Sequence, residues 1–285
     1  MTTEVSSLYE ASFVRNIGVF SKEEQERLRQ GRVTVVGCGG VGGITLIQLS
    51  RLGVGKIHAV DDDEFEPSNL NRQMLSSVSR LGHSKADSAK ESLEDINPDI
   101  EVVVSRERVT EENAAELLGN TDVVVDATDN LVSRVIVHRA AAKVGVPSIW
   151  IAVTPPFRGA VMSMTPDSTP YEVCLRQPSY QRPLTDDIKS QLNALKAGRA
   201  LHSVRYGADE EWAHSFVNGK APWAVISPVA NIVGVLASFE ALKFLLKRPG
   251  LDPVVGPELV RVNLAEPAMV QVVTPPEGTW DNTVL

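Results

Sequence analysis

Cysteine is scarce in this sequence. Its 285 residues include 2 cysteines, Cys38 and Cys174, too few for a disulfide framework or for a zinc site built from four cysteines. The opening residues, MTTEVSSLYE, also lack a basic stretch followed by an apolar run, so we expect no secretory signal. A reducing cytoplasm is therefore the expected compartment.

Basic residues are outnumbered by acidic ones. Lys and Arg together number 28 against 36 Asp and Glu, which gives a net charge of −8. This balance argues against broad attraction to nucleic acid or to an anionic membrane. A local basic pocket is still permitted by these totals.

Long hydrophobic runs are also rare. One stretch, residues 225–246, is apolar over about the length of a membrane span. It contains Pro228, Asn231, Glu240 and Lys243, which do not suit the interior of a bilayer. We therefore expect a buried or subunit-facing helix and no membrane partner.

The first half of the chain alternates short apolar runs with helical patterns. A capping-box spacing at Ser21–Glu24 predicts a helix that ends near Gly31. Continuous β-branched runs separated by helix-length segments are typical of parallel strands covered on both faces. The expected strands are RVTVV (32–36), KIHAV (56–60), IEVVV (100–104), DVVVD (122–126) and PSIWI (147–151). The pattern predicts a doubly wound, Rossmann-like α/β sheet that is mostly parallel.

The second half of the chain does not continue the regular alternation of apolar runs and helical patterns. A further strand is expected within 158–166 and a proline-rich loop over 166–183. A helix is expected over 185–198, followed by a polar stretch through Gly219. Two short strands near 259–264 and 268–273 complete the sheet, as C-terminal antiparallel strands. A long irregular region inside a compact domain is more often functional than accidental.

A glycine-rich segment, VVGCGGVGG (35–43), follows the first expected strand and opens a helix. Gly37, Gly39 and Gly42 occupy the positions of a G-x-G-x-x-G loop, in which the backbone approaches a phosphate at a helix N-terminus; Gly40 belongs to the same loop. The second strand then delivers DDDEFE from Asp61, where a carboxylate can bind ribose hydroxyls. An isolated glycine cluster is about as often an ordinary tight turn, but this context favours an adenine nucleotide.

The stretch SNLNRQ (68–73) adds cations and amides behind the second strand. A triphosphate that loses pyrophosphate needs positive charge where negative charge accumulates. Arg72 and Lys85 are the candidates for it, while Asn69 and Gln73 can hydrogen-bond the phosphates or the attacking group. Each alone is more often a solvated residue. Together they favour phosphate chemistry over hydride transfer.

The fourth strand ends in VVDATDN (124–130), at the sheet edge where ligands of α/β proteins bind. Carboxylates that face a triphosphate need a metal between them, so we expect Mg²⁺ at Asp129 with Asn130 alongside. Helix capping is the alternative role for an aspartate here. Asp126, nearer the strand, is expected to be structural.

Several of these motifs, in this order, resemble one family. VGCGGVGG, the Asp61 and Asp63 pair, SNLNRQ, the GHSK that ends at Lys85, and DATDN are similar to motifs of the ubiquitin-activating-type adenylyltransferases, the ThiF, MoeB and HesA group. The resemblance runs from VRNIGVFS (14–21) through the apolar helix. It is specific for the family and much less so for the substrate.

The resemblance implies an enzyme that binds ATP with Mg²⁺, activates a carboxylate as an acyl-adenylate and releases pyrophosphate. Asp61 would bind the ribose, Arg72 and Lys85 the phosphates, and Asp129 the metal. Arg15 resembles the family arginine that enters the neighbouring subunit's ATP site, which implies a homodimer. The carboxylate would be the C-terminus of a ubiquitin-like sulfur carrier or of a peptide. An acceptor carboxylate is itself a nucleophile, so alignment and charge neutralisation suffice without a triad.

The resemblance also implies an organisation of the chain. Residues 1–31 would form an N-terminal arm and helix, residues 32–165 the ATP-binding α/β core, and residues 166–285 a crossover loop, the apolar helix and C-terminal strands of the same domain. The crossover loop, from about residue 166 to residue 222, would cover the tail of the acceptor. His202, Arg205 and His214 lie in it and could contact a carboxylate, although solvated loop positions are the commoner fate.

The chain departs from the family pattern at the cysteines. Many relatives bind structural zinc through two Cys-x-x-Cys pairs, but Tyr171 stands where the first cysteine would be, with Cys174 retained and no C-terminal pair. We predict no zinc. Because residues 175–285 contain no cysteine, we also expect direct transfer of the adenylate to an external nucleophile.

Other functions stay open at this level. A relative that adenylates a modified tRNA nucleoside would be expected to carry a basic stripe, which the net charge opposes. A nicotinamide-dependent oxidoreductase could use the same glycine loop. That function would not explain why Arg72, Lys85 and Asp129 occur together. A catalytically silent partner subunit would be expected to lose the phosphate-binding cations, which this sequence retains.

Overall fold

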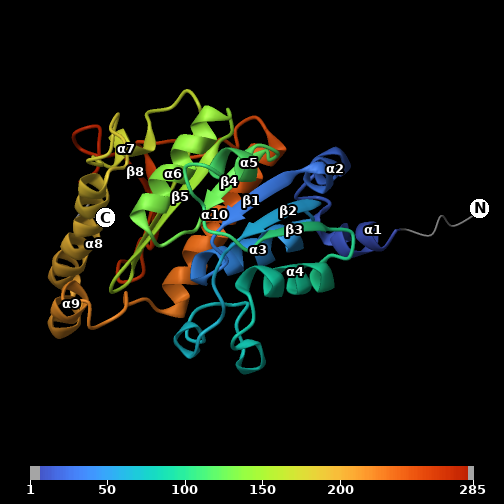
Figure 1. The fold of residues 1–285 in the computed structure, drawn as a ribbon. Coiled ribbons are helices and arrows are strands. Elements are labelled where there is room, and N and C mark those ends of the chain that lie inside the picture. The colour runs from blue at the N-terminus through green and yellow to red at the C-terminus, as the bar shows by residue number, and fades with distance from the viewer. Residues whose placement is uncertain (1–6, 282–285) are drawn as a thin grey trace, which may run out of the picture.

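The structure, a computed structural model, describes residues 7–281. Its centre is an 8-stranded sheet in the order β3-β2-β1-β4-β5-β6-β7-β8 (Figure 1). The strands are β1 (Arg32–Val36), β2 (Lys56–Val60), β3 (Glu101–Ser105), β4 (Val123–Asp126), β5 (Ser148–Thr154), β6 (Arg158–Met164), β7 (Leu259–Asn263) and β8 (Val270–Val273). The first five are parallel to their neighbours, and β6, β7 and β8 continue the sheet antiparallel. The predicted fold class is confirmed.

Helices cover both faces of this sheet (Figure 1). On one face lie α2 (Lys22–Gln30), α3 (Gly40–Leu52), α4 (Lys85–Ile96) and α10 (Ser227–Leu246), whose buried side chains share one core cluster. On the other lie α5 (Ala114–Leu118), α6 (Leu131–Lys143), α7 (Tyr171–Cys174) and α8 (Asp186–Ser203). Because side chains alternate along a strand, β4 sends Val123 and Val125 into the first core and Val124 into the second.

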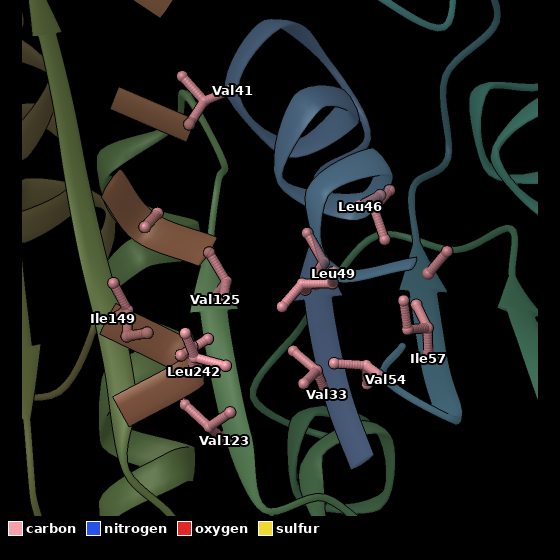
Figure 2. Close-up of a cluster of buried hydrophobic side chains, with 14 of the residues drawn as sticks. Val33, Val41, Leu46, Leu49, Val54, Ile57, Val123, Val125, Ile149 and Leu242 are labelled. Carbon is pink, nitrogen blue, oxygen red and sulfur yellow. The ribbon is translucent and has the colours of Figure 1, made fainter. Parts of the chain in front are cut away.

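The first core is the larger one. Figure 2 shows side chains of Val33, Ile57 and Val125, from three adjacent parallel strands, directed towards the face covered by α3 and α10. Strands buried on both faces favour apolar residues at most positions. That preference explains why the strands read as continuous β-branched runs in the sequence.

Helix α10 occupies the centre of the molecule. Among the described residues it is the one helix that is long and apolar enough to span a membrane, yet 61% of its apolar window is buried inside the protein. It packs closely on α3: a Cβ at Gly234 would stand 2.3 Å from Cγ2 of Ile44, and Thr45 donates a hydrogen bond of 3.1 Å to the Gly234 carbonyl. The expectation of a buried helix is confirmed.

Two segments for which the sequence predicted no regular structure contain helices, so those predictions are wrong. The expected N-terminal arm contains the helix α1 (Leu8–Phe13), which Ser7 begins with a capping box and which buries Tyr9 and Phe13. The polar stretch before Gly219 contains α9 (Glu210–Val217), capped by Asp209, and α8 continues to Ser203. Short 3-10 turns occur at Val14–Asn16, Pro67–Asn69, Val78–Arg80 and Val204–Tyr206.

Candidate active site

A large cavity opens at the carboxyl ends of β1, β2 and β4. The strand order reverses between β1 and β4, which is the point where open α/β sheets bind ligands. The cavity has a volume of about 720 Å³, within the range of roughly 300–1,000 Å³ typical of small-molecule sites. Eleven of the residues predicted from the sequence line it: Gly37, Gly39, Gly40, Asp61, Asp63, Asn69, Arg72, Gln73, Lys85, Asp129 and Asn130.

The glycine loop lines the cavity with backbone atoms that no side chain covers. Gly37 has φ +95°, and a Cβ there would lie 2.8 Å from the Ala127 carbonyl oxygen. A Cβ at Gly42 would lie 1.8 Å from the Gly37 carbonyl oxygen, so this glycine permits the loop to close and does not itself line the cavity. Helix α3 begins at Gly40. Its N-terminus therefore presents backbone amides and a positive dipole to the cavity.

Asp61, at the end of β2, is tied to the glycine loop. Its Oδ2 accepts a 2.6 Å hydrogen bond from the Cys38 amide, and its Oδ1 accepts one of 2.8 Å from the Asp63 amide. Burial raises the pKa of Asp61 despite these two bonds. The carboxylate is thus held at the carboxyl edge of the sheet, where it lines the cavity.

Two cations stand on the β2 side of the cavity. The Lys85 side chain is buried, and its Nζ lies 2.8 Å from Oδ2 of Asp63. Arg72 donates hydrogen bonds of 2.8 Å to the Ser68 carbonyl and 2.9 Å to Oδ1 of Asn71, and burial lowers its pKa. The alternative of a solvated surface lysine does not hold for Lys85.

Two of the three amide side chains of SNLNRQ, those of Asn69 and Gln73, line the cavity and differ in their bonding. Asn69 uses its Oδ1 to accept from the Glu66 amide at 3.1 Å, so part of its hydrogen-bonding capacity stabilises the loop. Gln73 is also buried, but its Oε1 has no hydrogen-bond partner among the described residues. A buried polar atom of this kind is costly unless a ligand or water pairs with it. Gln73 therefore fits a ligand-contacting role.

The loop after β4 divides into a structural and an exposed part. Asp126 is fully buried, accepts hydrogen bonds from Thr128 and lies 3.2 Å from Nε2 of His138; burial would raise its pKa, but His138 and Arg134 hold it below its usual value. Asn130 caps α6 by accepting from two backbone amides. The Asp129 side chain is 94% exposed. Asp129 is therefore the carboxylate of this loop that is accessible to a metal.

A second cationic group lies on the α8 side and was missed in the sequence. Lys196 and Arg199 project from α8, Arg134 comes from α6, and Trp223 follows the crossover loop. The spacing of Lys196 and Arg199 places them on one helix face, which is a visible but weak signal. That this face meets a cavity formed by residues far away in sequence requires the tertiary structure.

Other candidates lie elsewhere. Arg15, in the short turn Val14–Asn16, is exposed and does not line the cavity of its own chain. None of the crossover-loop residues His202, Arg205 and His214 lines it either. Cys174 is buried against the Thr169 carbonyl, and burial raises its pKa to about 11. Such a thiol is a packing residue with little thiolate character.

The family assignment follows from a match to the sequence pattern described as "ThiF family", which covers residues 13–277. The chain belongs to the ThiF family. Relatives within it are named as adenylyltransferases. The "Sulfur carrier protein ThiS adenylyltransferase" of Escherichia coli is 28% identical over 78% of this chain and 74% of its own length.

Higher identity occurs over shorter stretches. The "Probable adenylyltransferase/sulfurtransferase MoeZ" of Mycobacterium tuberculosis is 40% identical over 52% of this chain, and the "Sulfur carrier protein adenylyltransferase" of Thermus thermophilus is 42% identical over 46%. These matches span 37% and 48% of the relatives' own lengths. The chain thus matches about half or less of these two ThiF-family relatives.

Solved structures agree with the ThiF-family fold. E. coli MccB superposes with a TM-score of 0.71 at 19% identity, over 97% of this chain and 73% of MccB. PaaA superposes with a TM-score of 0.68 at 20% identity, over 96% of this chain and 75% of PaaA. At these identities the likeness supports the fold.

Proposed function

We propose that this protein is an ATP-dependent adenylyltransferase that activates a carboxylate as an acyl-adenylate. One observation carries the proposal: a single cavity joins a glycine loop, a ribose-side carboxylate, two phosphate-side cations and an accessible aspartate. An oxidoreductase would need the first two of these features and would leave Arg72, Lys85 and Asp129 unexplained. The naming of ThiF-family relatives as adenylyltransferases adds support.

The proposed reaction needs alignment and charge more than a nucleophilic side chain. A carboxylate oxygen of the acceptor attacks the α-phosphorus of ATP, and the bond from that phosphorus to the bridging oxygen of pyrophosphate breaks. Negative charge then moves onto the leaving pyrophosphate. Arg72 and Lys85 are positioned to stabilise that charge, while the glycine loop holds the phosphates. No proton has to be removed from the attacking group.

Mg²⁺ fits the chemistry of Asp129, which would hold it together with the ATP phosphates. Bound there, the ion would neutralise phosphate charge. The three carboxylates of Asp61, Asp62 and Asp63 also lie within 4.8 Å of one another. Asp61 accepts two amides, Asp62 pairs with Arg108 and Asp63 pairs with Lys85. Asp129 also lies near a cation, with its Oδ2 3.6 Å from Nζ of Lys196, but its side chain is 94% exposed, and this accessibility favours Asp129.

The proposed acceptor is the C-terminal carboxylate of a ubiquitin-like sulfur carrier or of a peptide. The names of the bacterial relatives refer to sulfur carrier proteins, and one E. coli MccB structure was solved together with MccA. Because Cys174 is buried and does not line the cavity, we propose direct transfer of the acyl-adenylate to an external nucleophile. A zinc-free protein located in the cytoplasm belongs to the same proposal. Buried Tyr171, at the position where the family resemblance would place a zinc-binding cysteine, stacks on His138 with the ring centroids 4.4 Å apart.

A homodimer completes the proposal. Arg15 would reach the neighbouring subunit's ATP site. Its surroundings support contact with another surface, since Val14 and Val19 are 61% and 66% exposed. Exposed apolar side chains in a cluster are typical of protein interfaces.

Exchange of radiolabelled pyrophosphate into ATP tests the proposed reaction. The purified protein is incubated with ATP, Mg²⁺ and a sulfur carrier or peptide that ends in a free carboxylate. We expect exchange that depends on both the acceptor and its terminal carboxylate. Exchange that proceeds equally with a C-terminally amidated acceptor would contradict the proposal.

A further inference from the structure

The cavity has positive charge on two separate sides. Arg72 and Lys85 follow β2 and lie near the glycine loop, whereas Lys196 and Arg199 come from α8 and lie near the end of β5. The carboxylate of Asp129 is close to both groups: its Oδ2 lies 3.6 Å from Nζ of Lys196, and its charge acts on Arg72. The exposed aspartate thus stands between two cationic groups.

The α8 group, Lys196 and Arg199, combines a partly exposed lysine with a buried arginine. Nζ of Lys196 donates to the Asp129 carbonyl at 3.0 Å, and Arg199 is 5% exposed. Arg134 packs behind them and donates to the carbonyls of Thr128 and Ile151. Burial and the proximity of Arg134 lower the pKa of Arg199 to about 10. A buried arginine that lies close to other cations is stabilised by an anion.

An aromatic wall continues from the α8 group. The Trp223 ring lies 5.8 Å from Nζ of Lys196 and is fixed by a 3.1 Å hydrogen bond from its Nε1 to the Val153 carbonyl. The rings of Phe216 and Trp212 contact Trp223 edge to face, with centroids 5.1 and 5.8 Å from the Trp223 ring. A charged end group bound near Lys196 would therefore have the Trp223 ring beside the atoms that precede it.

Adenylation brings the acceptor carboxylate close to the phosphates of ATP. One cationic group cannot bind and orient both anions. A carboxylate bound among Arg72 and Lys85 would compete with the phosphates for the same charges. A separate group on the opposite side of Asp129 can neutralise the carboxylate and orient it towards the α-phosphorus. The geometry of the α8 side provides such a group.

Resting on the adenylyltransferase function, we propose that Lys196 and Arg199 bind the terminal carboxylate of the acceptor and that Trp223 packs against its last peptide unit. The site then selects acceptors that end in a free C-terminal carboxylate on an extended tail. Lys196 and Arg199 are positioning residues for that tail, and Arg72 and Lys85 serve the nucleotide.

Calorimetry with the whole protein separates the two subsites. The nucleotide probe is the non-hydrolysable analogue AMPCPP with Mg²⁺, and the acceptor probes are acetylglycylglycine and its C-terminal amide, titrated into the nucleotide-saturated protein. We expect the free acid to bind at least about tenfold more tightly than the amide. Lys196→Met should abolish this difference while changing the AMPCPP affinity by less than about threefold. Lys196→Arg, which keeps the charge, should retain the preference.

The matched control is Lys189→Met, because Lys189 lies on the same helix, is 45% exposed and does not line the cavity; it should alter neither affinity. Equal binding of acid and amide to the wild type would overturn the proposal, as would a Lys196→Met variant that keeps the preference. If Lys196→Met weakens AMPCPP as strongly as Arg72→Ala does, the α8 group serves the phosphates, and the proposal is also wrong. Failure of the wild type to bind AMPCPP would instead contradict the adenylyltransferase function itself.

Discussion

Burial changes what the Lys85 side chain can do. Its exposed fraction is 7%, and it forms an ion pair with Asp63, which also lines the cavity. A lysine in this setting interacts with a phosphate more strongly than a solvated one, because water screens the charges less. Lys85 was predicted from the GHSK motif and from its place at the head of a helix.

Replacing Lys85 with methionine tests its role. Lys85→Met keeps the apolar stem and removes the charge, so we expect the affinity for Mg·ATP to fall by about 10- to 100-fold. Lys90→Met is the control, since Lys90 lies on the same helix and pairs with Glu94 at the surface. Calorimetric titration of both variants measures the effect. Equal losses in the two variants would argue against a phosphate contact at Lys85.

The glycine loop allows a steric prediction. Gly42→Ala places a Cβ 1.8 Å from the Gly37 carbonyl oxygen, whereas Gly39→Ala meets its nearest atom at 3.6 Å. We expect Gly42→Ala to lower the stability by about 1–3 kcal/mol or more and Gly39→Ala to fold normally. Thermal unfolding compares the two. Equal melting temperatures would show that the loop is not packed as described.

Local sequence patterns point to the residues on the proposed nucleotide side of the cavity and not to those on the proposed acceptor side. Gly37, Asp61 and Arg72 lie within or directly after motifs that follow a recognisable strand, so local pattern locates them. Lys196 and Trp223 occur in segments without such a motif. They reach the cavity because α8 packs beside α6 and the crossover loop returns over the sheet, and no local pattern contains that information.

At the scale of the elements, hydrogen bonds join the first turn of α2 to the segment that follows α10. Glu24 accepts the Ser21 amide at 2.8 Å and receives two hydrogen bonds of 2.6 Å from Arg248. The Arg248 hydrogen bonds and the Ser21 amide lower the pKa of Glu24 from 4.5 to about 2. The interaction is therefore present above pH 4.5 and is lost as the pH falls towards 2.

Substitution of Glu24 should consequently have a pH-dependent effect. Glu24→Gln removes the charge that pairs with Arg248, so we expect a lower melting temperature at neutral pH. The difference from the wild type should shrink as the pH falls from 4.5 towards 2. Glu26→Gln, on the same helix with a 52% exposed side chain, serves as the control. A difference that stays constant through this range would contradict the ion-pair account.

Strands were easier to predict than helices. The bounds of β1 and β2 agree with the predicted runs, because parallel strands covered on both faces are rich in β-branched and apolar residues. Helices α1 and α9 were missed. Each is short and bears polar residues between its buried ones, so packing against neighbouring elements contributes most of its stability. Their N-caps, Ser7 and Asp209, were the available signals.

At the scale of the whole molecule, the proposed dimer predicts complementation between subunits. A site would combine Arg72 of one chain with Arg15 of the other. Arg15→Ala and Arg72→Ala proteins should each bind Mg·ATP weakly. After mixing and random re-pairing in equal amounts, about a quarter of all sites should regain tight binding. Calorimetric stoichiometry measures that fraction, and sedimentation measures the mass of the assembly. No tight sites in a mixed, dimeric sample would argue that Arg15 acts elsewhere.

The molecule as a whole places the two proposed anion subsites on either side of one aspartate. The doubly wound half contributes the nucleotide side, and the segment from α8 to Trp223 contributes the acceptor side. Such a division would let the nucleotide half keep its motifs while the other half varies with the acceptor. Function on α/β folds commonly varies in this way, through the segments at the carboxyl edge of the sheet.

The most direct test of the central claim is calorimetric binding of Mg·ATP and, separately, of NAD, each to the wild type and to Arg72→Ala. Arg51→Ala, at an exposed position on α3, controls for loss of surface charge. The account predicts that Mg·ATP binds in preference to NAD and that Arg72→Ala, but not Arg51→Ala, weakens it by about tenfold or more. Preferential binding of NAD, or ATP binding that is indifferent to Arg72, would contradict the account.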